Sequence, residues 1–373
     1  MSYLLSIVVP TKNRYKYLEK LVELVIGFET SEIELVIQDN SNDNHEFLEF
    51  IEPLKRKHGW IKYYYESKYL TTIQNFDLAI SQCNGEYVCF IGDDDGVVRN
   101  IVYYASWMKE NDIEALRPSR AVYYWGNNGR YKQYATFEAG KKEFERLSPI
   151  HELIKILKGG CCNLGCIPVL YTGIVKRILL DEIYKDFGTY FPGVSPDAAN
   201  GTVLSFYVKR YVLVNNPIVI TGTSSQTGGG LQKKRIVELK DVPFLRREDF
   251  KDWEGVLPPI WTGSVVWPGS VISALRKMGK EELISEIDFD LVYANFYYLN
   301  KDYKDLILEY VQDKKRFYRY YLIIKLNELK NNILNKIVMI YSSHRRNITS
   351  HFFFGLSDII EAENQFYKIS NKK

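Results

Sequence analysis

The chain has 373 residues, of which 46% are hydrophobic and 25% charged, the composition of a globular protein long enough for a large core and two domains. The formal net charge is only +3, and basic charge gathers in residues 314–346, where nine Lys and Arg stand against one Glu. A nucleic-acid-binding protein is therefore not expected, because such proteins line their binding cleft with basic residues.

The five cysteines are an odd number without disulfide-framework spacing, which indicates free thiols in a reducing compartment. Cys161, Cys162 and Cys166 lack a fourth ligand at zinc-site spacing, so we interpret them as small buried residues. The first ten residues resemble no signal peptide, and no run of about 18 apolar residues predicts a membrane-spanning helix. A cytoplasmic protein is expected.

The first 110 residues alternate short apolar runs with helical patterns. Strands are expected at residues 4–9, 34–37, 61–66 and 87–91, and helices at 18–26, 46–57, 71–83 and 97–109. Continuous apolar runs are typical of strands buried on both faces, and strand–helix alternation is typical of a doubly wound, mostly parallel sheet. The pattern therefore predicts an α/β domain.

Polar residues follow three of these strands, at residues 10–14, 39–43 and 93–95. The carboxyl ends of parallel strands meet at one edge of a sheet, where α/β proteins bind ligands, so these segments are expected to converge on a nucleotide site. Each segment alone is also consistent with an ordinary turn or helix cap. Neither G-x-G-x-x-G nor G-x-x-x-x-G-K-[ST] occurs, so a standard dinucleotide domain and a P-loop are not supported.

The acidic run Asp93-Asp94-Asp95 comes directly after the apolar strand at 87–91. Three adjacent carboxylates repel one another, and a divalent cation relieves that repulsion. Mg²⁺ and Mn²⁺ prefer carboxylate oxygens, and Mg²⁺ typically takes one or two of them together with substrate phosphates. An acidic turn exposed to water is the alternative for these residues alone. Their convergence with the other polar segments favours a metal site that receives a nucleotide diphosphate.

The middle of the chain continues the alternation. Strands are expected at residues 121–125, 169–173 and 211–220, and helices at 151–157, 176–184 and from about 196 to 209. Asp197 follows Pro196 at the start of the last of these helices, which is also a good position for an Asp that caps a helix.

A Gly- and Ser-rich loop, residues 221–230, precedes the basic residues Lys233, Lys234 and Arg235. A loop of this kind can close over a diphosphate, with the basic side chains as partners of the phosphates. It can equally be the linker between two domains.

The region 231–373 is expected to be mainly helical. Its segment 314–346 carries an apolar stripe at helical spacing, formed by Leu322, Leu326, Leu329, Ile333, Ile337 and Ile340. A basic amphipathic helix can lie on an anionic membrane, which would give a peripheral contact. Packing against its own domain is the alternative.

These motifs resemble glycosyltransferase family 2, the inverting nucleotide-sugar transferases with the GT-A fold. The matching pieces are residues 9–14 near the N-terminus, 38–43 after the second strand, Asn75, and 85–90 before the acids. The resemblance covers the first 110 residues well and residues 111–225 loosely. It implies a GT-A Rossmann-like catalytic domain over residues 1–230, with the helical region 231–373 following it.

The resemblance also implies a nucleotide-sugar donor, most often UDP- or dTDP-linked, and Mn²⁺ (manganese) or Mg²⁺ as the cofactor. Asp39 matches the position that contacts the base, and Thr11 a nucleotide-contacting position. The donor-binding candidates are Pro10, Thr11, Asn13, Arg14, Asp39, Ser41, Asn75 and Asp93.

The acidic motif departs from the usual family pattern, because Gly92 stands where the first Asp is common. In that register Asp94 is the metal-binding residue, with Asp93 near the ribose and Asp95 in a supporting role. The simpler Asp-x-Asp reading would make Asp95 the metal ligand. Asp197 matches the catalytic base, although a Pro precedes it here in place of the more usual acid.

The expected activity is a metal-dependent, inverting transfer of a hexose to a hydroxyl of a saccharide or lipid-linked saccharide, in cell-surface polysaccharide synthesis at the inner face of the plasma membrane. One alternative is a sugar-phosphate nucleotidyltransferase, although the glycine-rich basic N-terminal loop of those enzymes is missing. Another is a non-catalytic scaffold with a degenerate transferase fold.

Overall fold

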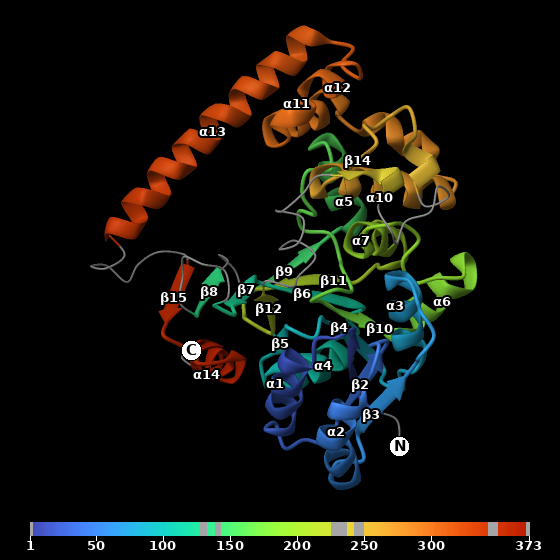
Figure 1. Ribbon diagram of the computed structural model, residues 1–373, viewed down its shortest axis with the longest axis vertical. Coiled ribbons are helices and arrows are strands. Elements are labelled where there is room, and N and C mark those ends of the chain that lie inside the picture. The colour runs from blue at the N-terminus through green and yellow to red at the C-terminus, as the bar shows by residue number, and fades with distance from the viewer. Residues whose placement is uncertain are drawn as a thin grey trace.

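The computed structural model describes residues 3–126, 133–138, 143–224, 237–241, 250–341 and 350–370. An α/β body forms one half of the molecule and a cap of helices forms the other (Figure 1). The sequence at 233–235, predicted to contact a diphosphate, lies outside the described residues.

The first seven elements alternate as predicted. They are β1 (Leu5–Thr11), α1 (Tyr15–Ile26), β2 (Ile33–Asp39), α2 (His45–Lys57), β3 (Ile61–Tyr65), α3 (Thr72–Ser81) and β4 (Tyr87–Phe90). Strand β1 pairs in parallel with β2 and β4, and β2 with β3. Every residue of β1 and β2 is buried, which explains why these strands are mostly apolar in the sequence; the buried Ser6 donates a hydrogen bond to Glu34 at 2.6 Å.

The next elements extend this sheet and add a second one. They are β5 (Gly96–Val97), α4 (Ile101–Glu110), β6 (Ala115–Pro118), β7 (Ala121–Tyr124), β8 (Tyr134–Glu138), β9 (Phe144–Leu147), α5 (Pro149–Lys158), β10 (Ile174–Lys176), α6 (Arg177–Phe187), α7 (Pro196–Tyr207), β11 (Tyr211–Val214) and β12 (Val219–Thr223). The larger sheet has the order β3-β2-β1-β4-β10-β6-β11-β9, and the smaller β15-β8-β7-β12-β5.

Three predicted elements need correction. The strand expected at 169–173 lies at Ile174–Lys176, and Tyr171 makes only an isolated bridge to Phe90. The strand expected at 211–220 is two strands in different sheets, because Pro217 has no N–H for a ladder and the chain turns there. The helix expected from residue 97 begins at Ile101, since Gly96–Val97 pair with β12.

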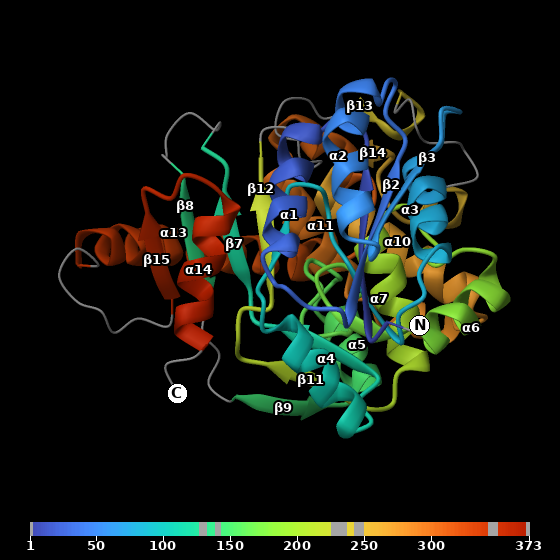
Figure 2. The same cartoon turned by 90° about the horizontal axis from the view of Figure 1, so that it is seen from below.

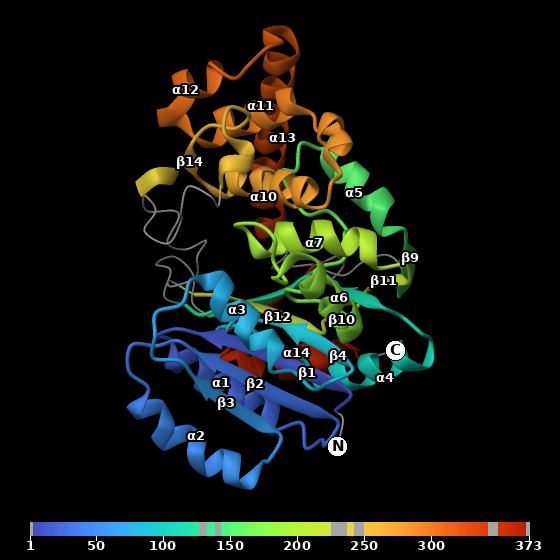
Figure 3. The same ribbon diagram turned by 90° about the vertical axis from the view of Figure 1, so that its right-hand side faces the viewer.

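The cap follows in the chain. Its elements are β13 (Val237–Glu238), η1 (Leu239–Asp241), η2 (Lys251–Trp253), β14 (Ile260–Trp261), α10 (Gly263–Lys277), η3 (Glu281–Glu286), α11 (Phe289–Leu299), η4 (Lys301–Tyr303), α12 (Lys304–Leu308) and α13 (Lys314–Tyr341). Helix α10 packs against α7, which therefore lies between the sheet and the cap (Figure 3). Among the helices described, none is both long and apolar enough to cross a bilayer.

The last described segment returns to the α/β body. Strand β15 (Ser350–Phe354) pairs with β8, and α14 (Ile359–Ser370) packs beside α1 (Figure 2). The fully buried Glu363 accepts hydrogen bonds from Arg99 Nε at 2.9 Å and Nη2 at 2.7 Å. Apolar residues of segment 350–370, such as Ile359 and Phe366, pack in the same hydrophobic core as β1 and β2, which is the first core of the protein. The division at residue 230 stays a prediction.

Candidate active site

The acidic run Asp93–Asp95 lies in the loop between β4 and β5, at the carboxyl edge of the sheet. All three residues are buried, with at most 2% of the surface of each residue exposed. Thr11, at the end of the neighbouring strand β1, donates a hydrogen bond from Oγ1 to Asp93 Oδ2 at 2.7 Å. The parallel pairing of β1 with β4 brings these two sequence motifs together, as predicted from their positions after strands.

Arg14 supplies the positive charge beside this cluster. Its Nη1 lies 3.0 Å from Asp93 Oδ1, and its Nη2 lies 2.7 Å from Asp94 Oδ2. Burial disfavours the charged guanidinium, but the carboxylates of Asp93 and Asp94 outweigh that effect and raise the pKa of Arg14. Burial raises the pKa of Asp93 to about 7, with Asp94 adding to the shift and Arg14 opposing it.

Asp95 is held differently. Its Oδ2 accepts hydrogen bonds from Gly92 N at 2.7 Å and from Tyr171 Oη at 2.6 Å, and its Oδ1 accepts one from Gly222 N at 2.6 Å. Burial and the neighbouring Asp94 raise the pKa of Asp95 to about 8. Asp95 therefore ties the β4–β5 loop to β12, which is a structural task.

Gly222 makes this arrangement possible. A Cβ at that position would lie 1.7 Å from the Asp94 carbonyl oxygen, so only glycine lets β12 approach the acidic loop. Trp125 also stabilises the acidic loop, because its Nε1 donates a hydrogen bond to the Asp94 carbonyl oxygen at 2.8 Å.

The oxygens facing Arg14 fit a divalent cation. Asp93 Oδ1 and Asp94 Oδ2 are buried and accept no hydrogen bond from the described residues, so their partner within those residues is the Arg14 charge. No three His, Cys, Asp or Glu side chains in the described ranges form a metal site by themselves. One or two carboxylates are what Mg²⁺ typically takes when substrate phosphates complete its shell.

The end of β2 forms the next part of the edge. Asp39 is fully buried; its Oδ2 accepts hydrogen bonds from Tyr15 Oη at 2.8 Å and Tyr63 Oη at 2.7 Å, and its Oδ1 accepts one from Ser41 N at 2.8 Å. Asn13 has a left-handed φ of 57° and donates its backbone N–H to Ser41 Oγ at 2.7 Å. The loops after β1 and β2 are thus joined, and Asp39 is positioned by two tyrosines.

Asn75, on α3, reaches the same edge. Its Nδ2 donates a hydrogen bond of 3.4 Å to the Thr11 carbonyl oxygen, while its Oδ1 is buried and has no hydrogen-bond partner in the described part of the chain. A buried acceptor without a donor is costly, and either an ordered water or a bound ligand would supply the missing donor. Pro10 lies within β1 and is buried.

Asp197 is in the first turn of α7, after the N-cap Ser195. Its side chain accepts no hydrogen bond from the described residues, so it does not act as a cap there. Burial raises the pKa of Asp197 to about 6, and the nearby Arg117 charge opposes the shift. Arg117 is itself held by the Leu164 and Ile167 carbonyl oxygens, at 3.3 and 2.8 Å from its Nη1.

Tyr171 connects the two acidic centres. It donates its hydroxyl proton to Asp95, and the charges of both Asp95 and Asp197 contribute to a raised Tyr171 pKa after burial, the largest cause. Sequence reasoning did not single out Tyr171 or Arg117. It placed Gly222 in the loop expected at 221–230, whereas Gly222 lies in β12. No local pattern marks these residues, because their partners lie far away in the chain.

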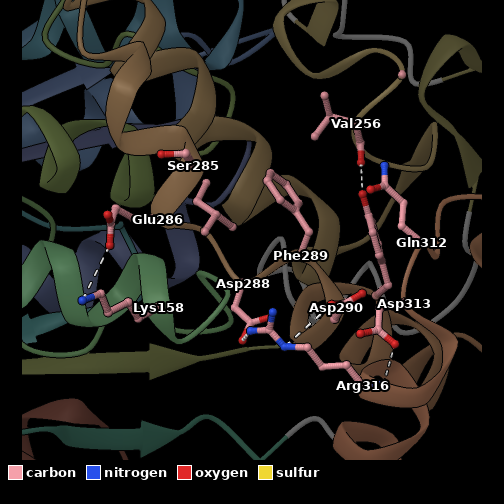
Figure 4. A pocket seen from close by; sticks show the side chains of 13 residues that line it. Lys158, Val256, Ser285, Glu286, Asp288, Phe289, Asp290, Gln312, Asp313 and Arg316 are labelled. Carbon is pink, nitrogen blue, oxygen red and sulfur yellow. Dashed lines mark hydrogen bonds and ion pairs between the residues drawn. The ribbon is translucent and has the colours of Figure 1, made fainter.

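A separate pocket of about 630 Å³ lies in the cap. It is lined by Lys158, Val256, Glu286, Phe289, Asp290 and other residues, none of which was predicted to belong to the site (Figure 4). Arg316 Nη2 lies 2.6 Å from Asp288 Oδ2 in this pocket, so the charges there largely pair with one another.

Comparison with known proteins agrees with this geometry. Residues 6–164 match the family described as Glycosyl transferase family 2. A segment of 93 residues is 31% identical to the GalNAc(5)-diNAcBac-PP-undecaprenol beta-1,3-glucosyltransferase of Campylobacter jejuni, covering 24% of this chain and 29% of that protein. The chain thus matches less than a third of that relative's length.

Two solved structures of S. aureus TarS, residues 1–349, share the fold. The complex with UDP-GlcNAc has a TM-score of 0.53 at 17% identity and covers 81% of this chain and 77% of that one. The second structure has a TM-score of 0.50 at 18% identity, with 81% and 76% covered. The predicted GT-A-like α/β fold with a helical C-terminal region is confirmed, and residues 6–164, somewhat less than half of the chain, match glycosyltransferase family 2.

Proposed function

We propose that the protein transfers a hexose from a nucleotide-sugar donor to a hydroxyl of a saccharide acceptor, with inversion at the anomeric carbon. The observation that carries this proposal is the presence of two acidic centres, the run Asp93–Asp95 after β4 and Asp197 in the first turn of α7. Asp93 and Asp94 face the Arg14 guanidinium at the carboxyl edge of the sheet, and Asp197 has a pKa raised to about 6. The first centre would serve the leaving diphosphate and the second the acceptor.

The donor-binding side consists of the loops after β1 and β2. Thr11, Asn13 and Ser41 line the strand ends, and Asp39, held by Tyr15 and Tyr63, is the candidate for contact with the base. A UDP- or dTDP-linked sugar is the proposed donor. UDP-GlcNAc in the similar TarS structure supports a uridine nucleotide.

Asp94 is the residue that we propose to hold Mn²⁺ or Mg²⁺, because the partner of its buried Oδ2 among the described residues is the Arg14 guanidinium, whereas three neutral donors occupy Asp95. A bound divalent ion would neutralise the charge that develops on the leaving diphosphate. Asp93, which accepts the Thr11 hydroxyl, would lie toward the ribose. Lys233, Lys234 and Arg235 remain candidates for the diphosphate.

Arg14 competes for the same carboxylates, so replacing it should strengthen metal binding. In Arg14→Gln we expect Mn²⁺ to bind roughly tenfold more tightly or better, because the guanidinium no longer neutralises Asp93 and Asp94. Electron paramagnetic resonance of free Mn²⁺ measures this directly. Lys12→Gln is the matched control, since Lys12 carries the same charge in the same loop but bonds to Asn40. Equal or weaker Mn²⁺ binding in Arg14→Gln would contradict this role.

Asp197 is the proposed general base. Its carboxylate takes the proton of the acceptor hydroxyl while that oxygen attacks the anomeric carbon from the face opposite the phosphate. The bond from the anomeric carbon to the phosphate oxygen breaks, and the nucleoside diphosphate leaves with the electron pair. A carboxyl with its pKa raised to about 6 is mostly deprotonated near neutral pH and remains basic enough to accept a proton.

Arg117 should set the pH at which this base works. It lowers the pKa of Asp197, so Arg117→Met should move the acid limb of the pH–rate profile from about pH 6 to higher pH. Arg117→Lys retains the charge and should leave the limb close to its original position. The measurement is the initial transfer rate between pH 5 and 9 for the three proteins. If the acid limb of the Arg117→Met profile stays at the same pH as in the original protein, Arg117 does not set the pKa of the general base.

The acceptor is proposed to be a saccharide or lipid-linked saccharide, in cell-surface polysaccharide synthesis at the inner face of the plasma membrane. The support is the Campylobacter jejuni relative, a glucosyltransferase whose acceptor is linked to undecaprenol through a diphosphate. The basic segment 314–346 adds to this support.

The products of the reaction test the proposal. Purified protein is incubated with UDP-, dTDP- and GDP-sugars, Mn²⁺ and saccharide acceptors, and the released nucleotide is identified. Free nucleoside diphosphate with an inverted glycoside is the expected result. Release of pyrophosphate from a sugar phosphate and nucleoside triphosphate would instead support a nucleotidyltransferase. No turnover and no nucleotide binding by folded protein would favour a scaffold.

A further inference from the structure

The described side chains of helix α13 contact the rest of the cap through one face. Phe317 is fully buried, and its ring meets Tyr297 of α11 edge-to-face at 5.4 Å between centroids. Tyr321, one turn later, contacts the same Tyr297 at 5.2 Å, and Ile324 packs against the same apolar cluster. The side chains of the N-terminal half of α13 thus pack the helix against α11, at the outer side of the cap (Figure 1).

The opposite face of α13 exposes apolar side chains. Tyr318, Leu322, Leu326 and Leu329 are 44%, 56%, 64% and 58% exposed. Their spacing of four, four and three residues places them on one stripe of the helix. Single exposed apolar residues are ordinary, but a continuous stripe on a long helix indicates a surface that binds something.

Basic side chains border this stripe. Lys315, Arg319, Lys325 and Lys330 are all exposed. The single acidic residue, Glu328, falls at helical spacing on the anchored side with Phe317 and Tyr321 and is only partly exposed. The exposed apolar stripe and these four cations together are called the α13 outer face. Its charge is therefore entirely positive among the described side chains.

We propose that the α13 outer face docks on an anionic phospholipid surface, with the helix lying in the plane of the interface. Apolar side chains would enter the headgroup region while the flanking cations meet lipid phosphates. Charge decides against a second copy of the chain as the occupant, because two such faces would bring eight cations together. The proposal rests on the proposed function only for its purpose, which is access to a lipid-linked acceptor.

The experiment is flotation of the full-length protein with vesicles of phosphatidylglycerol and phosphatidylcholine, compared with vesicles of phosphatidylcholine alone. Binding should require the anionic lipid and should fall steeply between 0.1 and 1 M salt, over which the Debye length shortens from about 10 to about 3 Å. The double variant Lys325→Gln with Lys330→Gln should bind the anionic vesicles more weakly, by roughly fivefold for each charge removed. Arg56→Gln with Lys57→Gln on α2 is the matched control.

The apolar stripe is tested by Leu322→Gln with Leu326→Gln, which should weaken vesicle binding roughly tenfold or more. Ile178→Gln, at a residue 54% exposed on α6, is the control for loss of an exposed aliphatic side chain. Circular dichroism checks that each variant is folded, and nucleotide titration checks the donor site independently of lipid.

Binding that is equal on neutral vesicles, or unchanged in both α13 double variants, would overturn the proposal. A dimer in solution that Leu322→Gln with Leu326→Gln converts to a monomer, without vesicle binding by either, would assign the face to a second copy. Vesicle binding by protein that binds no nucleotide would sustain this inference and contradict the proposed function, so the two failures are distinguishable.

Discussion

Asp197→Asn is expected to reduce sugar transfer by roughly 10²- to 10⁴-fold while donor binding stays nearly unchanged. The amide keeps the size of the carboxylate side chain but cannot take up the proton of the acceptor hydroxyl. Since no described residue donates a hydrogen bond to Asp197, the substitution should leave the fold intact. Initial transfer rates and nucleotide titrations on the same protein measure the two effects separately.

Asp181→Asn on α6 is the control for this experiment, because Asp181 forms a surface ion pair with Arg177. It should retain full activity. If Asp197→Asn lost nucleotide binding to the same extent as transfer, Asp197 would be a donor-site or structural residue. Full activity in Asp197→Asn would require a different general base.

Asp94→Ala is expected to abolish metal-dependent nucleotide binding, a loss of roughly a hundredfold or more, because the charged oxygen with no hydrogen bond is removed. The thermal stability of this variant should change little. The same substitution relieves part of the repulsion that raises the Asp95 pKa. Calorimetric titration with nucleotide and Mn²⁺ measures the loss.

Asp95→Asn should lower the stability of the fold more than it lowers nucleotide affinity, which is the reverse of Asp94→Ala. The amide nitrogen would face a backbone or hydroxyl donor, so a buried hydrogen bond is lost at a cost of about 1–3 kcal/mol in the free energy of unfolding. Nucleotide affinity should fall much less than in Asp94→Ala. Survival of binding in Asp94→Ala together with its loss in Asp95→Asn, in folded protein, would shift the metal ligand to Asp95.

The order of elements from β1 to β4 could be predicted because buried parallel strands leave continuous apolar runs in the sequence. The convergence of residues 10–14, 39–43 and 93–95 followed from one topological rule, that ligands gather at the carboxyl edge. The hydrogen bond from Thr11 to Asp93, between the ends of β1 and β4, is one contact that follows from this rule.

Long-range partners could not be predicted in this way. Tyr171 and Gly222 reach Asp95 from 76 and 127 residues away, and neither belongs to a periodic pattern. The prediction of a strand at 169–173 was wrong for a related reason. An apolar segment that makes one isolated β-bridge has the same sequence pattern as a true strand. The return of β15 and α14 to the first core depends on Glu363 and Arg99, a pair that no local signal reveals.

The most direct measurement is calorimetric titration of the purified protein with UDP, dTDP, GDP and CDP, each with and without Mn²⁺. The proposed function predicts binding of one nucleotide, with UDP or dTDP favoured, that depends on Mn²⁺ and is lost in Asp94→Ala. Binding of none of the four, by protein shown to be folded, would contradict the claim that this sheet edge is a nucleotide-sugar site.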